Sequence, residues 1–342
     1  MPSAYSPTFR ERLVRDWYLS RVTFLTLLLL PLSWLFRAIV AVRRAMYRSG
    51  LLDARRLPVP VIVIGNLTVG GTGKTPLVGW LAAELRNQRL RPGIVARGHG
   101  GANVTPRAVM PDDDPHVVGD EPILLARAGI PVWIGHDRVA TARALLAAEP
   151  GTNVILSDDG LQHYRLGRDV EILVVDGTRG FGNGRMLPAG PMREPHDRVT
   201  GVDAIVVNNS DAERMPFRTR PPMFMMHMTG ERFVNLADPE RTAGASDFAG
   251  KRVQAIAGIG NPGRFFDMLH RLGLDPVCHV FPDHHAYRRD DLEYRDAEVI
   301  VMTDKDAVKC RAFADSRMWR LPVAVELAPG LVEQVMEAVH GH

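Results

Sequence analysis

The chain of 342 residues contains only two cysteines, Cys278 and Cys310. Two thiols are too few for a disulfide framework or for a zinc site built from cysteines, and no small-residue cleavage site follows the first apolar segment. We therefore expect a reducing, cytosolic compartment. Apolar residues make up 46% of the chain and charged residues 24%, which excludes collagen-like, wholly disordered and polytopic membrane proteins.

The chain also lacks a general excess of positive charge, since its formal net charge is only +3. Within residues 1–60, ten arginines face three carboxylates, a balance of +7, so the remaining 282 residues carry −4. This distribution argues against a protein that coats nucleic acid, and we expect no nucleic-acid partner. The N-terminal segment is instead locally basic.

An apolar run without charge covers residues 22–36 and contains Pro31. A membrane-spanning helix needs about 20 such residues, and extending the run would bury Arg37 at a cost of roughly 2.5 to 3.5 kcal/mol near the bilayer centre. Arginines flank the run on both sides. We therefore expect a helix that lies in the interface of an anionic cytoplasmic leaflet. A hydrophobic helix packed on the soluble body is the alternative.

A strand, a glycine-rich loop and a helix follow one another after residue 57. Residues 61–64 predict a buried strand, residues 65–76 include Gly-Gly-Thr-Gly-Lys-Thr, and residues 77–87 predict a helix. In a P-loop the backbone cradles phosphates, a lysine reaches the β- and γ-phosphates, and a hydroxyl binds Mg²⁺. Thr68 replaces the first glycine of the strict motif, and a ligand-free turn is the alternative. The predicted nucleotide-binding residues are Gly70, Gly71, Thr72, Gly73, Lys74 and Thr75.

Short apolar strands then alternate with helical segments as far as residue 207. This alternation predicts a P-loop NTPase-like α/β fold, with helices on both faces of a parallel sheet. Asp158 and Asp159 follow the strand predicted at 154–156, at the sheet edge where ligands bind. Beside Thr75 they are candidates to hold Mg²⁺, although an Asp-Gly turn would use the same residues.

Strand and helix periodicity restarts after a stretch rich in proline and methionine. We therefore expect four parts: a membrane-associating segment, a nucleotide-binding α/β domain, an extended linker and a smaller α/β domain. Their predicted bounds are 1–57, 58–214, 215–236 and 237–342.

Three weaker signals lie outside the P-loop. Asp120 opens a predicted helix, where an N-cap is the simpler interpretation. His284 follows a predicted strand, and three interpretations fit it: a metal ligand, a catalytic base or a turn residue. A metal ligand is the least favoured, because only Asp283 has a clear ligand spacing to His284. Lys305 and Lys309 stand four apart on one helix face, either as solvated cations or as a phosphate-facing pair.

Seven short motifs occur in order along the chain. They are 65–76 (GNLTVGGTGKTP), 97–101 (RGHGG), 118–122 (VGDEP), 158–163 (DDGLQH), 187–195 (LPAGPMREP), 281–285 (FPDHH) and 303–309 (TDKDAVK). In combination they make the chain resemble the tetraacyldisaccharide 4'-kinases of lipid A synthesis, and that family shares the Thr68 departure. Ala96 and His99 differ from the serine and the aromatic residue expected there.

The resemblance implies transfer of the ATP γ-phosphoryl group to the 4'-hydroxyl of an acylated glucosamine disaccharide 1-phosphate. It places the enzyme at the cytoplasmic face of the bacterial inner membrane, as a peripheral, monotopic protein. It implies that Asp120 is the base and that His284, from the second domain, orients it. Charge neutralisation falls to Lys74, Thr75, Mg²⁺, Asp158, Asp159 and Glu194.

Two other functions fit parts of the same sequence. A P-loop ATPase or ligase-like enzyme acting on a soluble acid would use the apolar N-terminal helix only for packing. A nucleotide-switched membrane adaptor would bind nucleotide through the loop around Gly70, while Asp120 and His284 would be dispensable.

Overall fold

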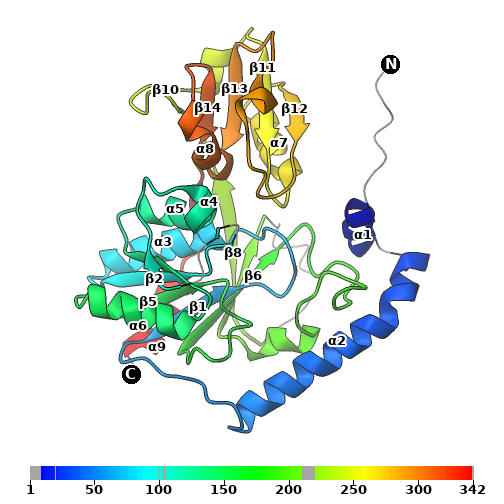
Figure 1. Ribbon diagram of the computed structural model, residues 1–342, viewed down its shortest axis with the longest axis vertical. Coiled ribbons are helices and arrows are strands. Elements are labelled where there is room, and N and C mark those ends of the chain that lie inside the picture. The colour runs from blue at the N-terminus through cyan, green and yellow to red at the C-terminus, as the bar shows by residue number, and fades with distance from the viewer. Residues whose placement is uncertain (1–8, 20, 100, 103–104, 210–219, 341–342) are drawn as a thin grey trace. The chain divides into compact units, whose positions relative to one another are not determined.

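The computed structural model describes residues 9–19, 21–99, 101–102, 105–209 and 220–340 (Figure 1). The chain folds into two compact units. One contains Met1–Thr72, Asp159–Met226 and Ala328–His342, and the other contains Gly73–Asp158 and His227–Leu327. Each unit is built around parallel strands, as the alternating pattern predicts.

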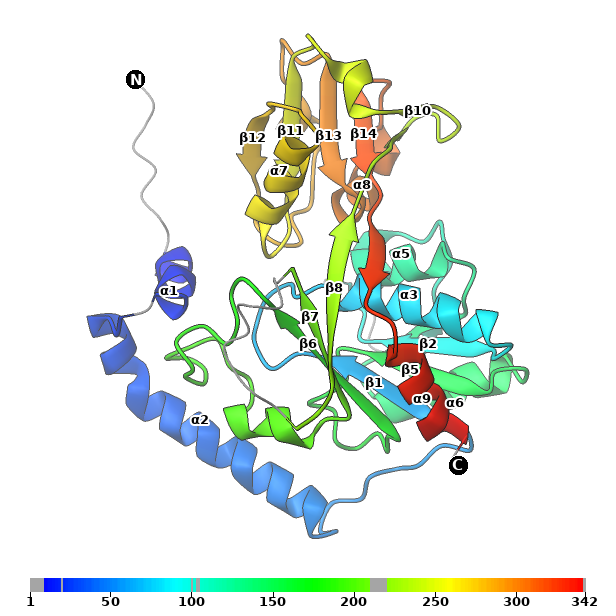
Figure 2. The same ribbon diagram turned by 180° about the vertical axis from the view of Figure 1, so that it is seen from behind.

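Four parallel strands form the centre of the first unit, in the order β8, β7, β6, β1 (Figure 2). Strands β1, β6 and β7 are buried along nearly their whole length, because apolar residues fill both of their faces. Helix α9 packs against β6. The bounds are β1 (Val61–Gly65), β6 (Val170–Asp176), β7 (Ala204–Asn208), β8 (Met223–Thr229) and α9 (Leu331–His340).

Two helices, α1 (Phe9–Trp17) and α2 (Phe24–Arg48), begin the described chain. The Thr23 side chain caps α2, and the helix continues through Pro31. Its buried residues are Thr26 and Ser33, and the Ser33 hydroxyl donates a hydrogen bond to the Met186 carbonyl. Among the described residues, α2 is the one helix whose length and composition would suffice to cross a membrane. Its exposed apolar residues are Phe24, Leu27, Leu28, Leu32, Trp34, Leu35, Ile39 and Val42.

In the second unit, strands β5, β2 and β4 run parallel, and β3 pairs antiparallel with β4. The chain passes from β2 to β4 through α5 and returns from β4 to β5 through α6. Because parallel crossovers are right-handed, α5 and α6 cover opposite faces, and α3 packs beside α5. The bounds are α3 (Lys74–Asn87), β2 (Pro92–Ala96), β3 (Arg107–Ala108), α4 (Pro115–Val118), α5 (Asp120–Ala126), β4 (Val132–Ile134), α6 (Arg138–Ala148) and β5 (Val154–Asp158).

A six-stranded sheet in the second unit has the order β10, β9, β14, β13, β11, β12, with its last four strands parallel. Helix α7 follows β11 and α8 follows β13, and they cover opposite faces for the same reason (Figure 2). The bounds are β9 (Phe233–Asn235), β10 (Thr242–Ala243), β11 (Val253–Ala257), α7 (Pro262–Arg271), β12 (Val277–Val280), β13 (Val299–Thr303), α8 (Asp304–Cys310) and β14 (Met318–Leu321). Strand β15 (Ala324–Leu327) is not part of this sheet.

Most predicted elements are confirmed within one to three residues. Helix α3 begins at Lys74 rather than residue 77, so the P-loop lysine belongs to the helix. The Met-rich stretch that was expected to be an extended linker strand forms β8, which pairs with β7. Strands β3, β9, β10 and β14 were not predicted.

Phe233 on β9 tests the core on the α7 side of the six-stranded sheet. Its fully buried ring contacts Phe248 at a centroid distance of 5.0 Å. We expect Phe233→Ala to lower the free energy of unfolding by about 3 to 5 kcal/mol, because it leaves a cavity. The matched control is Phe24→Ala, at a side chain that is 81% exposed. Denaturant titration followed by circular dichroism measures both, and equal effects would contradict the position of β9.

Candidate active site

The P-loop residues lie between β1 and α3, as predicted. Gly70 and Gly73 have φ values of 105° and 94°, which L-residues with a side chain rarely adopt. Gly73 is the N-cap of α3, and Lys74 is the first residue of that helix. The helix therefore places the positive end of its dipole at Lys74, an arrangement that suits phosphate oxygens.

Two buried asparagines support the P-loop through hydrogen bonds. The Asn66 side-chain amide donates to the Gly70 carbonyl and to the Thr72 hydroxyl, both at 3.3 Å. Asn208, at the end of β7, donates to the Thr72 carbonyl at 2.9 Å. Both asparagines are fully buried. The sequence interpretation did not identify them, because an asparagine at a strand end carries no signal of its own.

Thr75 and Asp158 meet as predicted for a magnesium site. The Thr75 hydroxyl donates to Asp158 Oδ2 at 3.2 Å. The buried Arg138 guanidinium donates to the Asp158 carbonyl and to that of Gly135, at 3.2 and 2.9 Å. Hydroxyl and carboxylate oxygens are the ligands that Mg²⁺ prefers. The donor set therefore fits the ion, and Arg138 is a supporting residue that the sequence interpretation missed.

Asp159 has a different role from its neighbour in this structure. Its two carboxylate oxygens accept hydrogen bonds from Arg193 at 2.8 and 3.0 Å. The same guanidinium donates to the backbone carbonyl and the side-chain oxygen of Asn66. Arg193 thus links Asp159 to the asparagine that supports the P-loop. Asp159 would bind a metal ion only through lone pairs that Arg193 leaves available.

Glu194 is almost completely buried, yet one of its oxygens is unoccupied. Oε2 accepts from the Tyr164 hydroxyl and lies 3.4 Å from Arg198 Nε, whereas Oε1 has no hydrogen-bond partner among the residues described. Burial, followed by the Glu194 charge, raises the pKa of Tyr164 well above its ordinary value, so Tyr164 stays a donor. A buried carboxylate oxygen without a donor fits a cation ligand.

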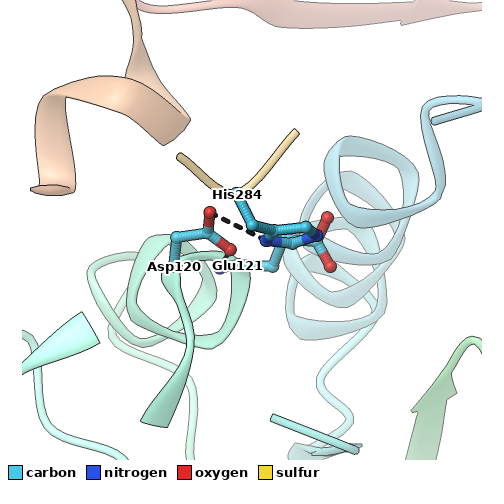
Figure 3. A group of neighbouring side chains, drawn as sticks. All are labelled: Asp120, Glu121 and His284. Atoms are coloured by element: carbon cyan, nitrogen blue, oxygen red, sulfur yellow. Dashed lines mark hydrogen bonds and ion pairs between the residues drawn. The ribbon is translucent and has the colours of Figure 1, made fainter. Parts of the chain in front are cut away.

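Asp120 and His284 are hydrogen bonded, with 3.2 Å between Asp120 Oδ2 and His284 Nδ1 (Figure 3). Both belong to the second compact unit, although the sequence interpretation placed them in different domains. The N-cap interpretation of Asp120 is wrong: Gly119 is the N-cap of α5, and Asp120 is the first helical residue. The pair forms because α5 packs against α8, while His284 lies in the loop after β12 at φ 60°.

The charges around this pair shift both pKa values. Burial would raise the pKa of Asp120, but the His284 hydrogen bond and the charges of Lys305 and Lys309 outweigh it, so the pKa is lowered. The hydrogen bond to Asp120 raises the pKa of His284 above its ordinary value, against the opposing effects of burial and Lys305. Asp120 is therefore ionised at neutral pH although its side chain is 3% exposed.

Asp120, Glu121 and His284 also have the layout of a metal site, with ligand atoms within 4.8 Å of one another. The Lys305 ammonium, however, lies 3.1 Å from Glu121 and 4.0 Å from Asp120. A protonated lysine already supplies the positive charge that such carboxylates attract, so the cluster is not a good cation site. The interpretation of Lys305 and Lys309 as solvated cations is also wrong, because both ammonium groups face Asp120.

Comparison with known proteins identifies the family. The model of the Tetraacyldisaccharide-1-P 4'-kinase family matches residues 25–340. The chain belongs to this family. A Tetraacyldisaccharide 4'-kinase from Azoarcus sp. (strain BH72) is 50% identical over 317 residues, covering 92% of each chain, and one from Methylobacillus flagellatus is 45% identical, covering 96% of each.

A solved structure of the kinase family has the same fold. The crystal structure of LpxK from Aquifex aeolicus in complex with ATP is 30% identical in sequence, with a TM-score of 0.78, and the match covers 92% of this chain and all of that one. The resemblance inferred from the seven motifs and the α/β fold class are both confirmed. The kinase family to which the chain belongs therefore includes a member that binds ATP.

The Asp120–His284 pair should make stability depend on pH. The raised pKa of His284 contributes stability below its unfolded value of about 6.5, and this contribution is lost as pH rises through the folded pKa. The lowered pKa of Asp120 contributes stability above about pH 3.9, and this contribution is lost as pH falls through the folded pKa. We expect His284→Gln to destabilise this kinase most near about pH 5 and least near about pH 8.

Thermal melts of the unmodified protein and of His284→Gln, taken between about pH 5 and about pH 8, measure the difference in stability. His227→Gln, at an exposed position on β8, is the matched control. A His284→Gln deficit that stays constant with pH would contradict the raised pKa of His284.

Proposed function

We propose that this chain transfers the γ-phosphoryl group of ATP to the 4'-hydroxyl of a tetraacylated glucosamine disaccharide 1-phosphate in lipid A synthesis. The observation that carries the proposal is the buried Asp120–His284 pair in the same compact unit as Lys74 and Thr75. Helix α3, which begins at Lys74, packs against α5, which begins at Asp120. A base and a phosphate-binding helix in one unit suit phosphoryl transfer to an alcohol.

Phosphoryl transfer requires positioning and charge neutralisation more than covalent catalysis. In the proposed complex, residues 70–75 bind the nucleotide phosphates, and Lys74 balances the charge that spreads over the γ-phosphoryl oxygens. Thr75, Asp158 and Glu194 would hold Mg²⁺, which supplies charge neutralisation at the phosphates when bound. Asp159 contributes through Arg193 or as a further ligand.

Asp120 is the proposed base. The sugar 4'-hydroxyl loses its proton to the Asp120 carboxylate as its oxygen bonds to phosphorus and ADP leaves. The lowered pKa of Asp120 keeps the carboxylate ionised and ready to accept. His284 orients it through the Nδ1 hydrogen bond. Proton transfer to a positioned group contributes about 10²- to 10⁴-fold to such reactions.

We propose further that α2 lies in the cytoplasmic leaflet of the inner membrane, where a lipid acceptor resides. Its large apolar side chains are exposed: Leu28 and Trp34 are each 64% exposed. Its polar residues Thr26 and Ser33 are buried instead. This is the reverse of a helix that packs on a soluble protein. An exposed apolar face beside arginines fits the interface of an anionic membrane.

The two alternative functions predict other arrangements. A soluble P-loop ATPase or ligase-like enzyme would use the apolar side of α2 for packing, whereas that side is exposed. A nucleotide-switched adaptor would not need a charged pair buried with two lysines. The kinase proposal accounts for both features.

The decisive experiment measures ADP formation with and without a tetraacylated disaccharide 1-phosphate. We expect hydrolysis of ATP to be slow alone and to rise strongly with this acceptor. Lys74→Ala and Asp120→Ala should each lower acceptor-dependent turnover at least about 10²-fold. Lys251→Ala, an exposed lysine on the same unit, is the matched control. Acceptor-independent turnover in the unmodified protein would favour the soluble ATPase, and full activity of Lys74→Ala would refute the kinase mechanism.

The role of α2 is tested by replacing two exposed leucines with glutamate. Each leucine that leaves the membrane loses roughly 1.5 to 3 kcal/mol of apolar transfer energy, so the Leu28→Glu/Leu35→Glu protein should bind anionic vesicles at least about 100-fold more weakly. Turnover on acceptor dispersed in detergent should be kept. Val280→Glu, at a 65% exposed position on β12, is the control. Vesicle flotation measures binding, and unchanged flotation would contradict the interfacial position.

A further inference from the structure

The Lys305 side chain contacts both members of the Asp120–His284 pair. Its Nζ lies 3.4 Å from His284 Nε2 and 4.0 Å from Asp120 Oδ2. It also donates to Glu121 and to Asp283, each at 3.1 Å. The side chain is only 14% exposed. Four groups that belong to the site or border it therefore share one buried ammonium.

Helix α8 holds Lys305 in this position through a buried carboxylate. Asp306 is fully buried and accepts hydrogen bonds from the Gly258 amide, the Tyr287 hydroxyl and the Thr303 hydroxyl, at 3.1, 3.1 and 2.7 Å. Thr303 is also the N-cap of α8. The backbone of the first turn is anchored in this way, and the Lys305 ammonium is held by its own contacts with Glu121, Asp283 and His284.

Lys309 lies one turn further along α8 and behaves differently. Its Nζ is 3.0 Å from Asp306 Oδ1 and 3.8 Å from Asp120 Oδ2. It thus adds positive charge beside Asp120 and neutralises Asp306. Of the two lysines, Lys305 is the one whose ammonium group is hydrogen bonded to His284.

The contact with His284 determines where the imidazole carries its proton. An ammonium group can only donate, so His284 Nε2 must accept. A neutral imidazole that accepts at Nε2 carries its proton on Nδ1, and Nδ1 is the atom that faces Asp120 Oδ2. The imidazole then donates to the carboxylate, which has no proton of its own to give. In the hydrogen-bonded series Lys305–His284–Asp120, each donor therefore faces an acceptor.

We propose that Lys305 is a positioning residue of the kinase, which opposes protonation of His284, favours its Nδ1–H form and so keeps Asp120 oriented as a free base. The proposal rests on the roles proposed above for Asp120 and His284. A protonated imidazole would hold Asp120 in an ion pair and weaken it as an acceptor for the sugar hydroxyl proton. Lys305 opposes that protonation by charge.

The other charged groups around His284 make this opposition necessary. Asp120 and Asp283 favour protonation of the imidazole, and Lys305 opposes it, while His99 contacts the His284 ring at a centroid distance of 5.0 Å. Lys305 itself remains charged despite its burial, because the carboxylates of Glu121, Asp120 and Asp283 raise its pKa above the ordinary value. The carboxylates near the imidazole are Asp120, Glu121 and Asp283. Lys305 contacts the ring itself, and Lys309 lies 3.8 Å from Asp120 Oδ2.

The first test is spectroscopic and needs no turnover. Full-length protein labelled with ¹⁵N-histidine in detergent gives the protonation state and tautomer of each imidazole, and His284→Ala assigns the His284 signals. We expect the Nδ1–H form in the unmodified protein and an upward shift of the His284 titration in Lys305→Met. Lys305→Gln provides the same loss of charge if the methionine variant does not fold. Lys251→Met is the matched control.

The second test is the pH dependence of kcat at saturating ATP and acceptor. In Lys305→Met, kcat at about pH 6 should fall about tenfold more than kcat at about pH 8.5. This difference corresponds to a shift of about one pH unit in the acidic limb of the kcat profile. Lys305→Arg keeps the charge and should keep the profile of the unmodified protein. KM for ATP should not change, because Lys305 is not part of the P-loop.

The outcomes separate this inference from the proposed catalytic roles. An Nε2–H tautomer in the unmodified protein, or an unchanged His284 titration in the neutral variants, overturns the role of Lys305 even if Asp120→Ala is inactive. A shifted titration with an unshifted kcat profile also overturns it. Full turnover of both Asp120→Ala and His284→Ala refutes the catalytic pair itself, whatever the spectra of Lys305→Met show.

Discussion

The ionised carboxylate of Asp120 is buried, and the surrounding part of the second unit compensates that single charge. A carboxylate away from water is tolerated only where hydrogen bonds and opposite charges replace its hydration. Helix α8 provides them through Lys305 and Lys309, and the loop after β12 provides His284. The packing of α5 on α8 is thus both a structural contact and the means by which the proposed base stays ionised.

The phosphate-binding side of the molecule is supported in a similar manner. Asn66 and Asn208 fix the loop carbonyls and the Thr72 hydroxyl, while Arg193 connects Asp159 to Asn66. Tyr164 and Arg198 hold one oxygen of Glu194, and the other has no donor in the described part of the chain. A loop that is rigid before nucleotide binds loses less entropy on binding, and charge placed in advance need not reorganise during the reaction.

The N-terminal helix α2 shows how the same sequence feature changes meaning with its surroundings. Its apolar residues alone are compatible with a spanning helix, a packed helix and an interfacial one. In the structure, the Ser33 hydroxyl bonds to the Met186 carbonyl, and Trp17 in the preceding helix donates to the Pro188 carbonyl. These polar contacts use one side of the N-terminal region and leave the leucines exposed, so the apolar surface is available to a lipid bilayer.

The sequence by itself determined the α/β class, the P-loop with Lys74 and Thr75, and the kinase family, because periodicity and short motifs are local properties. It also named Asp120 and His284 through the family resemblance. Only the tertiary structure decided that these two side chains share one unit, that Gly119 rather than Asp120 is the cap, and that Lys305 faces His284. The contact between Asp120 and His284 joins residues 164 apart and depends on how the elements pack, and burial rather than residue type decides whether a lysine meets water or a carboxylate.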